Sequence, residues 1–134
     1  MPNTSQAPNS DSNKVITHDN YVEVIWIGPQ DSSSVSLSSQ EALKAIEALK
    51  AAGKPVLLSL SLLDLPLRPD MGAFREVIKI FRSTTFDKIA ISGTVSPMVM
   101  TLIATVTSSF NKELDIAYFV NKDEALAWLM SPKK

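Results

Sequence analysis

Apolar residues along the chain follow two spacings in turn. Short runs that are rich in β-branched and other apolar side chains are typical of strands; they cover residues 21–28, 55–63, 87–93 and 113–119. Segments with apolar residues three and four positions apart are typical of amphipathic helices; they cover residues 40–53, 70–82, 96–110 and 121–131. This alternation predicts one α/β domain, with a mostly parallel sheet of four or five strands and about four helices.

Capping residues indicate where the helices begin. Ser38 and Glu41 have the spacing of a capping box, which predicts that the first helix starts there. The preceding stretch "SVSL", residues 34–37, is then expected to form a short paired segment. Asp70 and Ser96 are the expected N-caps of the second and third helices, and Asn121 and Glu124 cap the last one.

The first 19 residues differ in composition from the rest of the chain. They are rich in Asn, Ser, Asp and Pro and hold few apolar residues, so we expect 1–19 to be a flexible polar tail and 20–131 to be the folded domain. The N-terminus has neither the basic nor the apolar part of a secretory signal. Serines, an aspartate and a proline interrupt the longest apolar stretch, "PVLLSLSLLDLPL". We therefore expect a cytoplasmic protein without a membrane span.

Composition excludes several classes of function. The 13 basic and 14 acidic side chains nearly cancel, so no basic stripe remains for nucleic acid. The chain has no cysteine, which excludes disulfides and thiolate metal sites. Its one histidine, His18, lies in the predicted tail, where nothing would hold it against a nucleophile. The sequence therefore predicts no enzyme, no metal site and no cofactor.

Three stretches carry a resemblance to a known family: "FDKIAISG", "SGTVSPMVMTLI" and "YFVNKDEALAWL". With the order of the elements, they resemble the STAS family, and more closely its SpoIIAA-like branch of bacterial anti-sigma-factor antagonists. The resemblance covers roughly residues 20–131. It implies the SpoIIAA-like fold and the role of a regulatory module that binds other proteins.

The antagonists of this family are switched by phosphorylation of a serine at the start of their second helix, in a pattern close to Asp-Ser-Ser-Gly. The resemblance places the glycine at Gly72, the switch position at Met71 and the preceding position at Asp70. Methionine has no hydroxyl to accept a phosphate. We therefore expect a capped helix start here that does not work as the family's switch.

The candidate partner-binding surface comprises the loop at 64–72 and the neighbouring loop and helix start at 93–100. Its candidate residues are Asp64, Arg68, Asp70, Met71, Gly72, Thr94, Met98 and Met100. A protein partner is the first hypothesis, with a second copy of this chain as one form of it.

The alternative is a small apolar or lipid-like ligand. SpoIIAA-like domains are grouped with lipid-transfer folds, so the resemblance also implies this role. From Ile89 to Asn111 no residue is charged, which is unusual for an exposed helix. Such a helix could line a subunit interface, a partner groove or an apolar pocket, or it could simply be buried more deeply than its neighbours.

Overall fold

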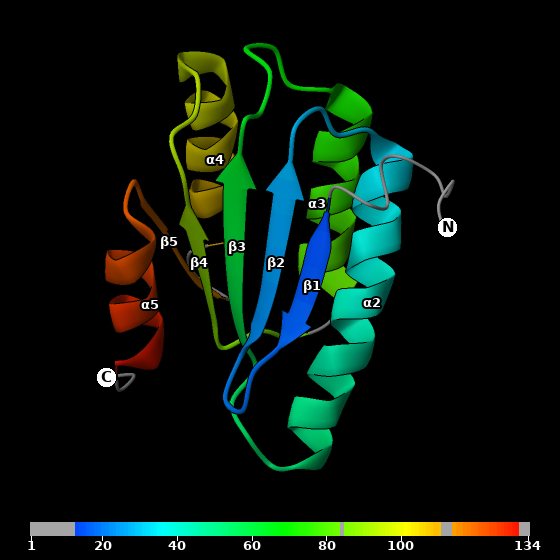
Figure 1. Cartoon of the computed structure of the whole chain (residues 1–134), viewed down its shortest axis with the longest axis vertical. Helices are drawn as coiled ribbons and strands as arrows, with labels where there is room; N and C mark the ends of the chain where they lie inside the picture. Colours follow the sequence, from blue (N-terminus) through cyan, green and yellow to red (C-terminus); the bar gives the residue numbers. More distant parts are fainter. Residues whose placement is uncertain (1–12, 84, 111–113, 132–134) are drawn as a thin grey trace, which may run out of the picture.

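The computed structural model describes residues 13–83, 85–110 and 114–131. Within these ranges five strands form one sheet in the order β1-β2-β3-β4-β5 (Figure 1). The strands are β1 (Lys14–Thr17), β2 (Val22–Ile27), β3 (Leu57–Leu63), β4 (Lys88–Ser92) and β5 (Asp115–Phe119). The helices are α2 (Ser32–Ala51), α3 (Met71–Ser83), α4 (Pro97–Phe110) and α5 (Lys122–Met130). The predicted α/β domain is confirmed.

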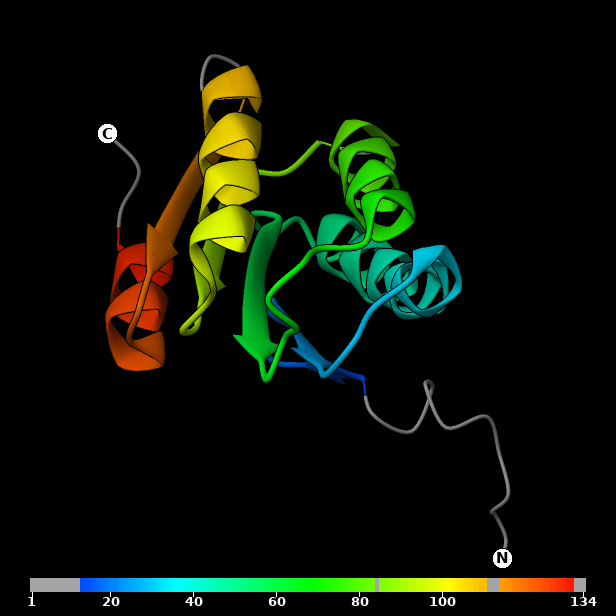
Figure 2. The same cartoon turned by 90° about the horizontal axis from the view of Figure 1, so that it is seen from above.

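α2, α3 and α4 cover one face of the sheet and α5 covers the other (Figures 1 and 2). Strands β2 to β5 are parallel neighbours, and α2, α3 and α4 connect them in turn on the same face. The main core lies between that face and these helices, and it includes Val24, Leu60, Ile91 and Ile116 from the sheet. A smaller cluster forms under α5, around Ala90.

β3 is the central strand, as its nearly continuous apolar sequence predicts. Leu58, Leu60 and Leu62 are buried against the helices, each at most 5% exposed. Ser59 and Ser61 point to the opposite face and are also buried. Both faces of this strand are therefore shielded from water.

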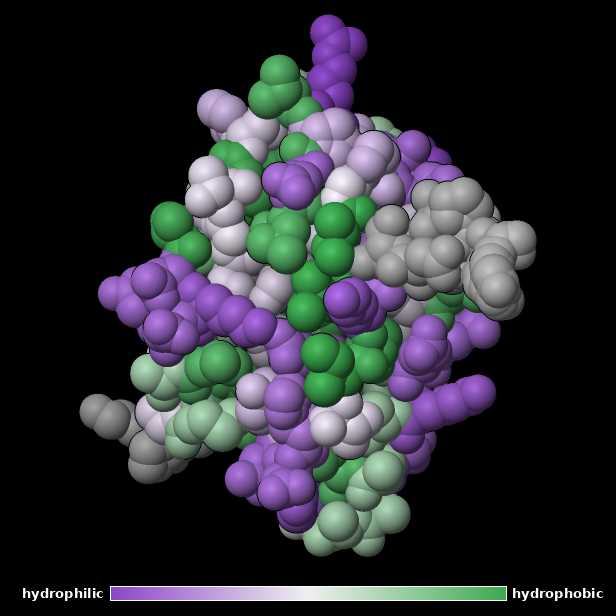
Figure 3. Space-filling model, viewed as in Figure 1, coloured by the Kyte–Doolittle hydropathy of each residue, from purple (hydrophilic) through white to green (hydrophobic). Residues whose placement is uncertain are grey.

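Beyond α5, the second face of the sheet is open. Ile16 is 39% exposed and Leu63 is 46% exposed, and Ile25 and Ile27 are half-buried. Figure 3 shows apolar side chains along the middle of this face.

α5 is fixed to the sheet through a buried lysine. The Nζ of Lys88 donates hydrogen bonds to the carbonyl of Trp128 at 2.9 Å and to the carbonyl of Ser131 at 2.8 Å. It also lies 4.9 Å from the centroid of the Trp128 ring. The last carbonyls of a helix lack partners within the helix and carry the negative end of its dipole. Lys88 therefore neutralises the end of α5 from inside the fold.

The prediction for the start of the first helix is wrong. Residues 34–37 lie inside α2 and not in a strand, and the helix begins at Ser32 instead of at Ser38. Its capping box uses Asp31, whose carboxylate accepts from the N–H of Ser34 at 2.8 Å, while the Ser34 hydroxyl accepts from the N–H of Asp31. Serines farther along satisfy their hydroxyls within the helix, and the hydroxyl of Ser39 donates to the carbonyl of Val35 at 2.6 Å.

The predicted boundary of the N-terminal tail is also wrong. Lys14–Thr17 form β1, which pairs with β2 in antiparallel register, and Lys54 donates to the carbonyl of Asp19 at 2.6 Å. The segment is only four residues long, but the open edge of β2 provides the partners for its backbone groups. Residues 1–12, the rest of the predicted tail, lie outside the described residues.

Deleting residues 1–19 should lower the thermal unfolding midpoint by about 3–8 °C, because the β1 ladder and the contacts of His18 and Asp19 would be lost. The measurement compares the full chain with chains beginning at Asn13 and at Asn20. Equal midpoints for the two truncated chains would show that β1 does not contribute to stability.

Candidate functional site

The two segments of the predicted surface lie together at one edge of the sheet. Parallel strands place their carboxyl ends at the same edge, so the β3–α3 and β4–α4 loops are neighbours (Figure 1). A hydrogen bond joins the loops: the hydroxyl of Ser96 donates to the carbonyl of Leu67 at 2.8 Å. The same hydroxyl accepts from the N–H of Val99 at 3.2 Å, so the predicted cap of α4 is confirmed.

The junction at the start of α3 is a capped helix start, as predicted. The Oδ1 atom of Asp70 accepts from the N–H of Ala73 at 2.9 Å. Met71 is the first residue of α3, and half of its side chain is exposed. A Cβ atom on Gly72 would lie 3.0 Å from Asp70 Oδ1 and 3.6 Å from the Cβ of Ser32. A side chain here would therefore press on the capping carboxylate of Asp70, whereas Ser32 at the start of α2 is at ordinary contact distance.

Beneath this edge lies an apolar cavity of about 110 Å³ between the sheet, α3 and α4. Its walls come from all three elements and include Trp26, Leu60, Ile91, Ala73, Val77, Leu102 and Val106. Leu65, Pro66 and Pro69 of the β3–α3 loop line it as well. Of the residues that line it, only Pro66 and Asp70 are exposed, and we take the opening to solvent to lie on their side. We refer to this opening as the mouth.

The cavity exists because α3 leans toward α2 and away from α4 (Figure 2). At the opposite end aromatic rings close the space between α3 and α4. The ring of Phe81 meets those of Phe86 and Phe110 edge to face, with centroids 6.1 Å and 6.0 Å away. The guanidinium of Arg82 lies 5.7 Å from the centroid of the Phe110 ring. The site is therefore a pocket with a closed apolar end.

Gln30 and Asp70 are the polar residues among those that line the cavity. The amide of Gln30 is already bonded: Nε2 donates to Asn13 Oδ1 at 3.0 Å, and Oε1 accepts from the hydroxyl of Ser34 at 3.0 Å. Asp70 makes the capping bond to Ala73. In the described part of the chain, no three His, Cys, Asp or Glu side chains gather in a way that could hold a metal ion. The walls of the cavity therefore offer mainly apolar contacts to a ligand.

The structure places the predicted site residues around the cavity and not in its walls, with the exception of Asp70. Asp64, Arg68 and Thr94 are exposed on the two loops, and Asp64 has a positive φ of 55°. Met98 and Met100, on α4, are 53% and 36% exposed.

Sequence reasoning missed most of the cavity's walls. Trp26 lines the cavity, and its Nε1 donates to the hydroxyl of Ser38 at 3.0 Å. Leu102 and Val106 of α4 also line the cavity. The absence of charge along α4 was the one signal of a pocket in the sequence.

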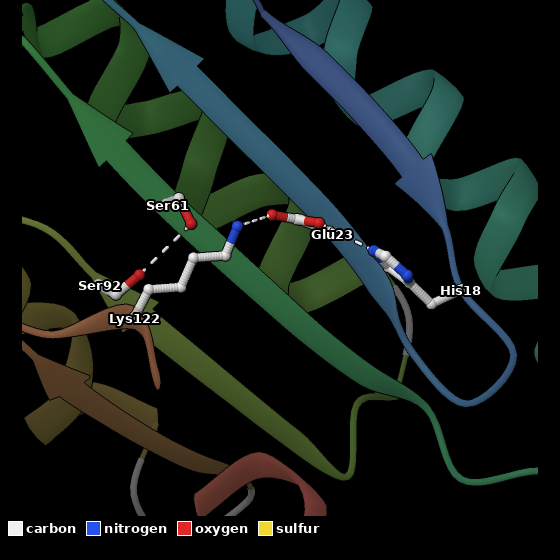
Figure 4. A network of polar contacts seen from close by, with 5 residues as sticks. All are labelled: His18, Glu23, Ser61, Ser92 and Lys122. Atoms are coloured by element: carbon white, nitrogen blue, oxygen red, sulfur yellow. Dashed lines mark hydrogen bonds and ion pairs between the residues drawn. The ribbon is translucent and has the colours of Figure 1, made fainter. Parts of the chain in front are cut away.

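A polar cluster lies on the face of the sheet that α5 covers, opposite the cavity (Figure 4). Glu23 on β2 is only 4% exposed, and its carboxylate contacts a histidine and a lysine. One oxygen is 2.8 Å from Nε2 of His18, and the other accepts from Nζ of Lys122 at the start of α5. The His18 ring also stacks on Tyr21, with centroids 4.4 Å apart. His18 was expected in a flexible tail, and this position corrects that expectation.

The charges around Glu23 determine its protonation. Burial raises the pKa of the Glu23 carboxyl, but hydrogen bonds from Lys122 and His18 outweigh this effect. The pKa of Glu23 therefore lies below its ordinary value of 4.5. The cluster joins the β1–β2 turn, the sheet and α5, so its role in the fold is structural.

A solved structure is similar to this chain over most of its length. It is the crystal structure of an uncharacterised protein of the DUF3478 family from Shewanella loihica PV-4, described as having a SpoIIAA-like fold. The two chains are 19% identical and superpose with a TM-score of 0.50, covering 87% of this chain and 91% of the other. This chain has a SpoIIAA-like fold. The resemblance drawn from the sequence is confirmed at the level of the fold.

Other comparisons give no further relative. No family model matches the sequence, and no curated protein matches it. None of the helices in the described ranges is long and apolar enough to cross a membrane. The function of this chain therefore has to be inferred from its own residues.

The free energy of unfolding should change with pH through the contacts of Glu23 with His18 and Lys122. The pKa of Glu23 is lower in the folded state than in the unfolded state, so its contribution is fully present above the unfolded pKa and is lost as pH falls through the folded pKa. Glu23→Gln should cost about 1 kcal/mol at pH 7, a modest value because His18 and Lys122 are partly exposed.

Denaturant titrations from pH 7 to pH 3 provide the measurement. The difference between the original chain and Glu23→Gln should shrink below pH 4.5, the ordinary value. A difference that stays constant to pH 3 would contradict the assigned ion pairs.

Proposed function

We propose that this chain is a non-catalytic binding module that holds a small apolar group in the cavity between α3, α4 and the sheet. The observation that carries the proposal is the composition of the cavity. Fifteen of the 17 residues that line it are apolar, and the two polar ones lie on the connecting segments before α2 and α3. Specific sites for apolar ligands have this character, with few polar groups in a largely preformed cavity.

The size of the cavity limits the ligand. An apolar cavity of about 150 Å³ in a protein core stays dry and binds benzene. At about 110 Å³ this cavity is somewhat smaller, but it is open at the mouth. It fits a ring or a short aliphatic group, and a long acyl chain would extend out of the mouth.

An occupant would also stabilise the fold. The apolar atoms that line an empty pocket lack contact partners on one side, which costs stability. A ligand that restores the missing contacts recovers part of this free energy. The stabilisation should therefore be visible as a rise in the unfolding midpoint.

Benzene should bind in the cavity, and Ala73→Leu should abolish this binding. Ala73 is buried in the α3 wall, and a leucine there would fill the space. The matched control is Ala104→Leu on the exposed side of α4, which should bind like the original chain. Trp26 reports binding by its fluorescence in a Trp128→Phe background, where it is the only indole.

Two results would contradict the proposal. One is a fluorescence and a thermal midpoint that benzene leaves unchanged. The other is equal benzene binding by Ala73→Leu and Ala104→Leu. Native mass spectrometry of the purified chain then shows whether an apolar molecule is retained from the cell.

The exposed apolar side chains beside the mouth favour a second candidate function, contact with a protein partner. Leu67 is 76% exposed, Met71 50% and Met98 53%. Methionine adapts well to varied contacts, and exposed apolar side chains that gather at one edge often mark interaction sites. In this role the chain is a SpoIIAA-like regulatory module whose contact surface includes Met71 in place of a phosphorylatable serine.

Met71→Glu tests this second candidate. Unfolding stability should stay within about 1 kcal/mol, because Met71 is half exposed and an acidic residue is favourable at a helix start. Affinity for a protein that co-purifies with the chain should weaken by about 1–3 kcal/mol, since an apolar contact is replaced by a charge. Thermal melts and titrations measure both. An unchanged affinity would exclude Met71 from the contact, and Met71→Ser is the uncharged control.

A further inference from the structure

Asp70 gives the cavity a charged group at its mouth. Among the residues that line the cavity, Asp70 is the only one that carries a formal charge at neutral pH. Its side chain is exposed at the solvent side, whereas the opposite end is closed by the rings of Phe81 and Phe110. An apolar ligand with one polar end would therefore place that end beside Asp70.

The other charges near the mouth are mostly negative. Asp31 follows Gln30 in the chain and Asp64 precedes Leu65, and both Gln30 and Leu65 line the cavity. Arg68 is the basic residue of the same loop. By sequence, the segments beside the cavity therefore carry three acidic residues and one basic residue, and a partly enclosed apolar site weakens the screening between a ligand's charge and Asp70.

The positive end of α3 does not reverse this preference. A helix start attracts anions through its free N–H groups and its dipole. Here the Oδ1 atom of Asp70 already accepts from the N–H of Ala73 at 2.9 Å. An arriving carboxylate would meet the Asp70 carboxylate before it reached the helix. A hydroxyl or an ammonium group could instead donate a hydrogen bond to Asp70.

We propose that Asp70 makes the cavity selective for apolar ligands that end in an amine or a hydroxyl, and against those that end in a carboxylate. This inference rests on the proposed function, because it concerns the polar end of the ligand that the cavity holds. The ligand class is then a small aromatic or short aliphatic amine, with the alcohol of the same shape as a weaker ligand.

Three probes with the same ring test the selectivity: benzylamine, benzyl alcohol and benzoate. Affinities are measured from Trp26 fluorescence in the Trp128→Phe background and checked by calorimetry at pH 7 and low ionic strength. Benzylamine should bind about tenfold more tightly than benzoate, with benzyl alcohol between them. Added salt should reduce this ratio, because it screens the charges at the mouth.

Asp70→Asn tests whether the selectivity depends on this one residue. Asparagine is as good an N-cap as aspartate, so α3 keeps its cap while the charge is lost. The ratio of benzylamine to benzoate affinity should fall to about threefold or less. Asp64→Asn removes one carboxylate from the same loop without touching the cavity wall, and it should change the ratio less than Asp70→Asn does.

The outcomes separate the two proposals. If benzene binds but benzoate binds as tightly as benzylamine, the selectivity is overturned and the binding function stands. An unchanged ratio in Asp70→Asn also overturns it. If neither benzene nor any of the three probes binds, the proposed function fails, and this inference fails with it.

Discussion

The position of α3 is the constraint on which the candidate site depends. Four parallel strands in sequential order require their three connecting helices to lie side by side on one face. α3 packs toward α2 and leaves α4 apart (Figure 2). The ring contact of Phe81 with Phe110 then joins α3 to α4 at one end only. The remaining space becomes an apolar cavity because α4 carries no charged side chain toward it.

The opposite face of the sheet is organised by buried charges. Lys88 binds the carbonyls at the end of α5, and Lys122 at its start binds Glu23. Both ends of this helix are thus tied to the sheet by ammonium groups, and His18 adds the β1–β2 turn to the same cluster. Charged groups can be this deeply placed only when partners replace the lost water. Polar contacts that hold the fold together therefore lie on one face of the sheet, and the candidate binding site lies on the other.

Local sequence patterns predicted much of the fold and part of the site. The strand at 55–63 and the cap of α3 at Asp70 follow from composition and spacing, and the structure has both. The start of α2 was predicted wrongly. A serine can cap a helix, but it can also lie inside one and donate its hydroxyl to a carbonyl of the preceding turn, and the sequence does not separate the two. The N-terminal strand was missed because its β-branched residues Val15, Ile16 and Thr17 form only a four-residue strand with Lys14, next to a polar segment, and its backbone depends on the edge of β2 for hydrogen bonds.

The sequence by itself determined the order of β2 to β5 and of the four helices, the capped junction at Met71 and the uncharged character of α4. These are local properties, which follow from the spacing of apolar residues and from capping chemistry within a few positions of the chain. Only the tertiary structure decided that Trp26, Ala73 and Val106 share one cavity, and that Asp70 stands at its mouth. Those residues lie on different elements, and their distances depend on how three helices pack on one sheet, which no local pattern encodes.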